Sequence, residues 1–136
     1  MSKKQVKNVF VYGTLKEGRP LDRKAFADTR LSVTPATIVG SIFNLGPYPA
    51  IKLKGKGVVQ GEIHEFDKKD VKEIVKIMDR IEGYNPKGDE KHNLYNRRVV
   101  TAKTKDGEKL EAYVYEYSNE LKESMKIEDG LWEPGL

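Results

Sequence analysis

An acidic side chain on the apolar side of a predicted helix is the strongest chemical signal in this sequence. Within residues 69–84, apolar side chains recur at helical spacing and predict one buried face; they are Val71, Ile74, Val75, Met78 and Ile81. Glu82 follows Val71 by 11 residues, which places it about 20° from Val71 around the helix, on the same face. Gly83 is typical of a helix end. Burial and the negative end of the helix dipole both raise a carboxyl pKa, and a raised pKa suits a general base.

The competing interpretation is that Glu82 lies at a frayed helix end, in water or paired with Arg97 or Arg98. Periodicity alone does not decide between the two interpretations. The remaining polar residues of the helix are expected on its flanks and its solvent side; they are Lys72, Glu73, Lys76 and Asp79.

The turn after the first predicted strand is a second candidate site. Residues 8–12 are β-branched and aromatic, and they run into Gly13, Thr14 and Leu15. Glycine lets the backbone approach a ligand closely, and consecutive N–H groups at a strand end can bind a carboxylate or stabilise an oxyanion. Taken alone, the pattern favours an ordinary strand and turn, because such sequences are common.

Other chemistries have little support. His64 and His92 are far apart and have no paired ligand spacing, so we expect no metal site. The sequence has no Cys, which excludes disulfides and thiol nucleophiles and fits a reducing compartment. Ser41 and Ser124 do not lie in a nucleophile-elbow motif. Tyr113, Tyr115 and Tyr117 share one face of a strand, and we interpret that face as core or rim rather than as a base-stacking surface.

The elements that must position these residues are mostly short strands. We predict strands at residues 8–12, 36–45 (one or two strands broken at Gly40) and 58–66, and a two-residue hairpin turn at Asp106 and Gly107 between strands 97–105 and 108–117. We also predict a rigid turn at 46–49, a helix at 21–28 besides the one at 69–84, an exposed loop at 85–93, and a Trp132-containing end that packs on the body or wraps a rim. Many strands with one clear helix favour an α+β fold, a small β-barrel or curled sheet with helices laid against it.

Length, charge and the distribution of apolar residues limit the classes of protein to which this chain can belong. The 136 residues predict a single domain, residues 1–136. Lys and Arg exceed Asp and Glu by only 4 charges and alternate with them, so electrostatics do not argue for a nucleic-acid partner. No apolar run is long enough to span a membrane, and residues 1–7 are polar rather than a signal peptide, so we expect a cytoplasmic protein with no membrane partner.

Several segments together resemble the gamma-glutamylcyclotransferase-like family, in particular its AIG2-like branch, which includes gamma-glutamylamine cyclotransferase. The resembling segments are VFVYGTLKEGRP (9–20), GPYPAI (46–51), VVQGEIHEF (58–66), IMDRIEGY (77–84) and YNRRVV (95–100). They span most of the chain in the family's order. The first segment and the Asp-x-x-Glu-Gly element, here Asp79, Glu82 and Gly83, are the most specific.

The resemblance implies a small mixed β-barrel with flanking helices and a cavity at one end for a gamma-glutamyl group. It implies that the backbone of Tyr12, Gly13, Thr14 and Leu15 holds the substrate, that Glu82 is the proton acceptor, and that Tyr95 walls the pocket, although Tyr95 fits a core position equally well. The implied enzyme is an acyltransferase-type cyclotransferase. The substrate's α-amine attacks its own γ-carbonyl and releases 5-oxoproline and a free amine, and neither a cofactor nor a metal is required.

Two alternatives remain: a binding module on the same fold that does not turn its ligand over, and a basic barrel that binds nucleic acid. The sequence leaves the substrate open, and it fits either a monomer or a homodimer. The polar insert between Glu82 and Tyr95 could cover the cavity and select the leaving amine, but we favour a solvated surface loop.

Overall fold

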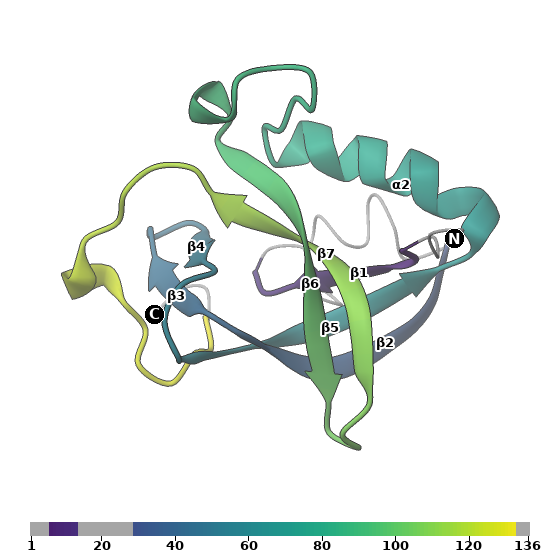
Figure 1. The fold of residues 1–136 in the computed structure, drawn as a ribbon, viewed down its shortest axis with the longest axis horizontal. Coiled ribbons are helices and arrows are strands. Elements are labelled where there is room, and N and C mark those ends of the chain that lie inside the picture. Colours follow the sequence, from purple (N-terminus) through teal and green to yellow (C-terminus); the bar gives the residue numbers. More distant parts are fainter. Residues whose placement is uncertain (1–5, 14–28, 133–136) are drawn as a thin grey trace.

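The structure is a computed structural model that describes residues 6–13 and 29–132 (Figure 1). The predicted helix at 21–28 and two predicted site residues, Thr14 and Leu15, lie outside the described residues. The described elements in chain order are β1 (Asn8–Val11), β2 (Arg30–Val39), β3 (Ser41–Asn44), β4 (Pro49–Lys52), β5 (Val58–Phe66), α2 (Lys68–Ile81), a 3-10 turn η1 (Glu90–His92), β6 (Tyr95–Thr104), β7 (Lys109–Tyr117) and a second 3-10 turn η2 (Glu123–Met125).

Five strands form a closed barrel in the order β1-β5-β2-β6-β7. The ladders β1–β5, β5–β2, β2–β6 and β6–β7 are antiparallel, whereas β1 closes the barrel on β7 by a parallel pair at Val9 and Tyr113. The two remaining strands, β3 and β4, form a small antiparallel sheet at one end of the barrel (Figure 1). The predicted α+β fold, a small mixed barrel with a helix against it, is therefore confirmed.

Alternation along β1 divides the apolar residues between two cores. Phe10 and Tyr12 belong to the cluster that fills the barrel, together with Ile38, Ile63, Val114 and Trp132. Val9 and Val11 point the other way and pack in a second cluster with Met78 and the other apolar residues of α2. The helix is thus held along the barrel by its apolar stripe, and its C-terminal end is brought to β1 and β7 (Figure 1).

The ends of α2 carry the expected capping signals. Asp67 is the N-cap, and its carboxylate accepts a hydrogen bond from the Lys69 N–H at 3.1 Å. At the other end the Tyr84 N–H donates to the Asp79 carbonyl at 2.8 Å and the Gly83 N–H to the Arg80 carbonyl at 3.3 Å, which is a Schellman motif. Gly83 has φ of +67°, a conformation that favours glycine.

Two local predictions need correction. The β6–β7 connection is a three-residue loop rather than a two-residue turn: Thr104 donates to the Glu108 carbonyl, and Gly107, with φ of +85°, donates back to Thr104. The segment 46–49 was predicted as a turn only, but Pro49 begins strand β4 and pairs with Asn44. Proline is tolerated there because it is the first residue of a strand in a two-stranded sheet.

The C-terminal segment packs back on the barrel, as predicted. The Ile127 N–H donates to the Ile42 carbonyl, and the Gln60 N–H donates to the Gly130 carbonyl, each at 2.9 Å. The Trp132 side chain is buried in the barrel core, and its Nε1–H donates to Asn44 Oδ1 at 3.2 Å. None of the helices in the described part of the chain is both long and apolar enough to cross a membrane.

Candidate functional site

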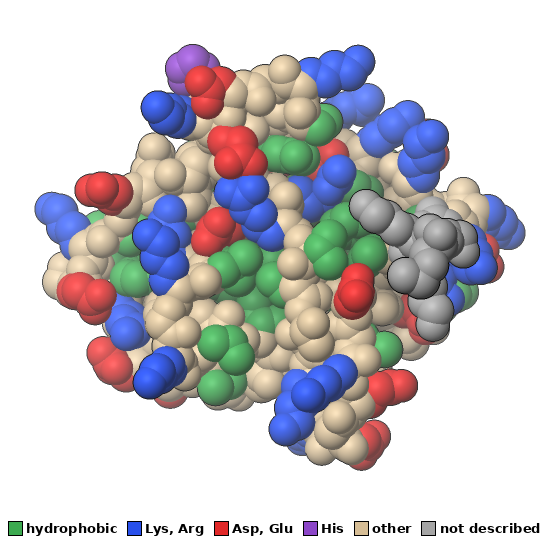
Figure 2. Space-filling view, viewed as in Figure 1, with side chains coloured by type: hydrophobic (Ala, Val, Ile, Leu, Met, Phe, Trp, Pro, Cys, Tyr) green, Lys and Arg blue, Asp and Glu red, His purple; other side chains and the backbone are tan. Residues whose placement is uncertain are grey.

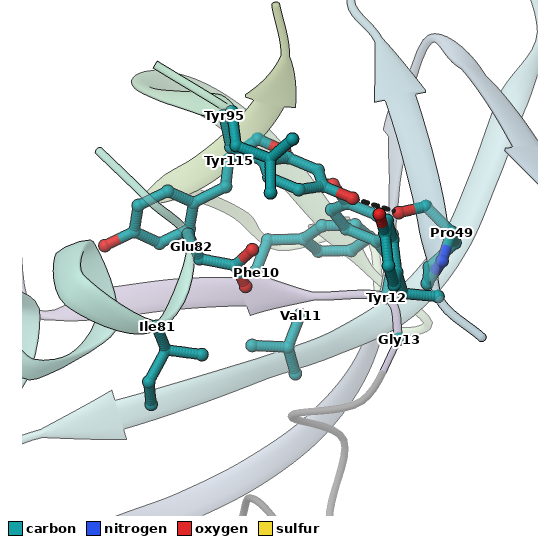
Figure 3. Close-up of a pocket in the computed structure, with 11 residues that line it drawn as sticks. Phe10, Val11, Tyr12, Gly13, Pro49, Ile81, Glu82, Tyr95 and Tyr115 are labelled. Atoms are coloured by element: carbon teal, nitrogen blue, oxygen red, sulfur yellow. Dashed lines mark hydrogen bonds between the residues drawn. The ribbon is translucent and has the colours of Figure 1, made fainter. Parts of the chain in front are cut away.

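A pocket of about 220 Å³ opens where β1 separates from β7. The ladder between these strands has a single partner pair, Val9 and Tyr113, so residues 10–13 continue beyond it without pairing to β7. The pocket occupies this divergence and is covered on one side by the end of α2 (Figure 3). Its lining residues are Phe10, Val11, Tyr12, Gly13, Tyr48, Pro49, Ile81, Glu82, Leu94, Tyr95 and Tyr115.

Glu82 is the C-cap residue of α2, and its side chain points into this pocket toward Phe10 (Figure 3). The backbone of Glu82 is held by its N–H bond to the Met78 carbonyl at 2.9 Å and by the Schellman motif that follows. Among the described residues, no hydrogen bond or ion pair engages its carboxylate. Arg97 pairs with Asp79, and Arg98 pairs with Glu90 and Glu116, so neither arginine neutralises Glu82.

Burial raises the pKa of the Glu82 carboxyl from 4.5 to about 7. The residue as a whole keeps an intermediate exposure, because the pocket that it lines is open to solvent. Protein atoms nevertheless surround the carboxylate closely enough to disfavour its charged form. Among the described lining residues, Glu82 is the only one of the types Asp, Glu, Lys, Arg and His, and the pKa of its carboxyl is near neutral.

Two of the tyrosines that line the pocket with Glu82, Tyr12 and Tyr95, use their hydroxyls to join the elements that form it. The Tyr12 hydroxyl donates to the Tyr115 carbonyl at 2.5 Å, bridging the gap between β1 and β7. The Tyr95 hydroxyl donates to the Pro49 carbonyl at 2.6 Å. Burial, followed by the charge of Glu82, raises the pKa of both Tyr12 and Tyr95, so both remain neutral at physiological pH.

Gly13 lines the pocket, and its lack of a side chain has a structural reason. A Cβ at this position would lie 2.6 Å from Pro49 Cγ and 2.7 Å from Pro49 Cδ. Alanine would therefore displace Pro49, whose carbonyl positions Tyr95. The absence of a Gly13 side chain thus lets the β3–β4 turn approach β1 and form one wall of the pocket.

Asp79 was predicted on the flanks or solvent side of α2, and this prediction was wrong. Its side chain is buried: Oδ2 accepts from Arg97 Nη1 at 2.6 Å, and Oδ1 accepts from the Tyr115 hydroxyl at 2.7 Å. Arg97 also lies over the rings of Tyr84 and Tyr113, 5.3 and 5.1 Å from their centroids. Asp79 therefore joins the helix end that carries Glu82 to strands β6 and β7.

The polar insert at 85–93 does not line the pocket. Glu90 forms a bidentate pair with Arg98 of β6, at 2.6 and 3.2 Å, and its carbonyl accepts from Asn96 Nδ2 at 3.2 Å. Asn93 is buried and donates from Nδ2 to Asn96 Oδ1 at 2.9 Å. The insert is thus folded against β6, and Leu94, directly after it, reaches the pocket.

The sequence pointed to Tyr12, Gly13, Glu82 and Tyr95, and the structure brings all four together. The sequence did not identify five other lining residues as part of the pocket: Phe10, Tyr48, Ile81, Leu94 and Tyr115. Tyr115 belongs to the tyrosine stripe of β7, which was interpreted as core or rim, and the Pro-Tyr-Pro turn at 47–49 was interpreted as a turn only.

The two histidines remain apart from the pocket: His64 is buried, with Nε2 3.0 Å from Glu62 Oε1, and His92 is exposed. Across residues 6–13 and 29–132, no three His, Cys, Asp or Glu side chains form a group that could hold a metal ion.

This arrangement can move one proton in an aromatic pocket. A carboxyl with a pKa of about 7 can accept a proton from a bound amine and return it to another group. The unpaired edge of β1 beside it can supply backbone groups to a polar ligand.

Residues 9–134 match the family model described as gamma-glutamyl cyclotransferase, AIG2-like. A gamma-L-glutamyl-butirosin B gamma-glutamyl cyclotransferase from Niallia circulans is 34% identical over 110 residues, which cover 79% of this chain and 66% of the relative. The fold is similar to YkqA from Bacillus subtilis, with a TM-score of 0.66 at 22% identity, over 94% of this chain and 40% of that one. It is also similar to an AIG2-like protein from Mus musculus, with a TM-score of 0.65 at 21% identity, over 96% and 90% of the two chains. Because the family model spans most of the sequence, this chain belongs to the AIG2-like gamma-glutamyl cyclotransferase family.

Proposed function

We propose that this protein is a cyclotransferase that converts a gamma-glutamyl amine or peptide into 5-oxoproline and a free amine, with Glu82 as general base and acid. The observation that carries the proposal is the placement of Glu82. In a family named for this chemistry, a carboxyl with a pKa of about 7 lies in a small pocket without an ionic partner among the described residues. A family relationship alone would leave open which residue acts.

The proposed reaction needs one proton acceptor. The α-ammonium of the substrate gives a proton to Glu82, and the resulting amine nitrogen attacks the γ-carbonyl carbon, forming the new C–N bond of a five-membered ring. The tetrahedral intermediate then collapses: the bond to the leaving nitrogen breaks, and Glu82 returns its proton to that nitrogen. The ring nitrogen still carries one proton too many for 5-oxoproline, and Glu82, ionised again, passes that second proton to the released amine, which leaves as an ammonium. Both reacting groups belong to one molecule, so the protein chiefly holds them in a near-attack geometry.

The turn after β1 is the proposed substrate cradle. Backbone N–H groups of Tyr12, Gly13, Thr14 and Leu15 would bind the substrate's polar groups and the oxygen that becomes negative in the intermediate. The unpaired edge of β1 beside Glu82 supports this proposal for Tyr12 and Gly13. Tyr95 is proposed as a wall, because its hydroxyl is already donated to Pro49.

The proposal includes the whole chain, residues 1–136, as one domain acting as a monomer or homodimer. Nucleic-acid binding has less support. On the face shown in Figure 2, Lys and Arg side chains are mixed with Asp and Glu over most of the surface.

The experiment is an assay of 5-oxoproline release from a panel of gamma-glutamyl peptides and amines by the wild type and by Glu82→Gln. Circular dichroism of both proteins confirms that the variant folds. Product from the wild type and none from the folded variant would support the proposal. Binding of gamma-glutamyl compounds without product from either protein would indicate a non-catalytic binding module instead.

A further inference from the structure

The mouth of the pocket is apolar. Three of its lining residues are large hydrophobic side chains that remain exposed: Tyr48 (38%), Ile81 (38%) and Leu94 (41%). Exposed side chains of this size that converge on one pocket are typical of a ligand-binding surface. Figure 3 shows Ile81 beside Val11 on one side of the Glu82 carboxylate.

The three side chains come from different elements, and each is held in place. Ile81 is the last residue of α2. The Leu94 N–H donates to the Gly83 carbonyl at 3.1 Å, and the Leu94 carbonyl accepts from the Ser118 N–H at 3.1 Å. Tyr48 packs edge-on against Tyr95, with ring centroids 6.5 Å apart. This rim, defined as Tyr48, Ile81 and Leu94, is therefore preformed.

The rim adjoins Glu82 directly, which indicates the part of the substrate that it contacts. Ile81 precedes Glu82 in sequence, and a Cβ on Gly83 would lie 3.1 Å from Leu94 Cβ. If Glu82 returns its proton to the leaving nitrogen, that nitrogen must lie within hydrogen-bond reach of the carboxylate. A substituent on this nitrogen would then leave the pocket across the rim.

We propose, resting on the proposed function, that the rim of Tyr48, Ile81 and Leu94 is the leaving-group subsite and that it selects gamma-glutamyl amides of uncharged, apolar amines. An apolar substituent is removed from water at the rim, which is favourable. A cationic substituent would lose hydration there without gaining an ionic partner from the described lining residues, since the only charged one, Glu82, is engaged with the reacting amine.

A matched pair of substrates tests this preference. Gamma-glutamyl-hexylamide and the mono-gamma-glutamyl amide of cadaverine have the same length and differ only in a terminal methyl or ammonium group. We expect kcat/KM of the wild type to be on the order of tenfold higher for the hexylamide, a factor that one or two apolar groups provide in a hydrophobic pocket. Leu94→Asn should reduce this ratio at least threefold, whereas Leu31→Asn should not, because Leu31 is an exposed leucine of β2 outside the pocket.

Binding separates the subsite from the reaction. Calorimetry of both amides with Glu82→Gln, in which no turnover is expected, should show the hexylamide binding on the order of tenfold more tightly. Equal affinities, a preference for the cadaverine amide, or no binding of either amide would overturn the subsite, even if the wild type releases 5-oxoproline. A preference for the hexylamide without 5-oxoproline release by the wild type would support the subsite and overturn the proposed reaction.

Discussion

At the scale of the residue, the central feature is a carboxyl that titrates near neutral pH. Glu82 has a pKa of about 7 because protein atoms around the pocket disfavour its charged form. A base with this pKa is about half deprotonated at pH 7 and can also return a proton. The same property affects the activity and the stability of the protein, and the two effects can be measured separately.

The activity should follow the ionisation of Glu82. Since the proposed base must be deprotonated, kcat/KM should rise with pH along a limb whose midpoint is about 7, the pKa of the free enzyme. The measurement is the initial rate of 5-oxoproline release between pH 5 and 9. An acid limb with a midpoint near 4.5 would show that the pKa of the base is not raised, and a limb that persists in the residual activity of Glu82→Gln would assign it to another group.

The stability should respond in the opposite direction. The pKa of Glu82 is higher in the folded than in the unfolded state, so the folded state binds more protons between pH 4.5 and 7 and loses stability as the pH rises through that range. The ionised Glu82 carboxylate thus lowers the free energy of unfolding by at most about 3 kcal/mol at pH 8. Solvent in the open pocket makes this loss smaller. Glu82→Gln removes this loss.

The melting temperature of Glu82→Gln should therefore exceed that of the wild type at pH 8 and approach it at pH 4.5. Thermal unfolding of both proteins at the two pH values makes the comparison. A variant that is less stable than the wild type at pH 8 would contradict a buried, unpaired carboxylate.

At the scale of the element, the end of α2 is fixed by a contact that periodicity does not reveal. Glu82 could be predicted because helical spacing and the following glycine depend only on neighbouring residues. The burial of Asp79 could not, because its partners Arg97 and Tyr115 lie 18 and 36 residues away on β6 and β7. In the same way, the strands at 8–12, 58–66 and on either side of Asp106 and Gly107 were predictable from local sequence patterns, whereas residues 30–35 of β2 and the whole of β4 were not predicted. The pairing of Pro49 with Asn44 depends on the fold of a two-stranded sheet.

Asp79→Asn tests whether this contact positions Glu82. The variant leaves Arg97 without its carboxylate. We expect a stability loss of about 2–4 kcal/mol, somewhat less than the loss of about 3–5 kcal/mol for a fully buried pair, because Arg97 is partly exposed. Loss of the anchor should also lower kcat more than it changes KM, because substrate binding does not use Asp79. Denaturant unfolding and steady-state kinetics measure the two effects.

The matched control is Glu73→Gln on the same helix. Glu73 pairs with Lys76 at 3.5 Å on the exposed side, and such pairs contribute about 0–1 kcal/mol. If both variants lose the same small amount of stability and keep full kcat, Asp79 does not position the helix end.

At the scale of the whole molecule, the barrel is completed by a residue near the end of the chain. The five strands enclose a core into which Trp132 inserts, and its Nε1–H is donated to Asn44 of β3. A Cβ on Gly13 would lie 3.9 Å from the Trp132 ring, so the same side chain also packs below the pocket wall. The sequence predicted that this end packs on the body or wraps a rim. It did not predict the insertion into the core, because no periodic pattern marks a single buried side chain.

Trp132→Ala should therefore destabilise the whole protein. Truncation of a buried aromatic side chain costs about 3–5 kcal/mol, which lowers the melting temperature by about 10 °C or more in a chain of this size. Val99→Ala, at an exposed position of β6, is the control and should change the stability by less than about 1 kcal/mol. Equal melting temperatures for the two variants, measured by circular dichroism, would contradict the insertion of Trp132 into the core.

The most direct measurement is the rate of 5-oxoproline release at pH 8 by the wild type and by folded Glu82→Gln, with a gamma-glutamyl amide at saturating concentration. We predict product from the wild type and a rate at least about 100-fold lower from the variant, because the variant lacks the general base. Comparable rates from the two proteins would show that Glu82 is not the proton acceptor.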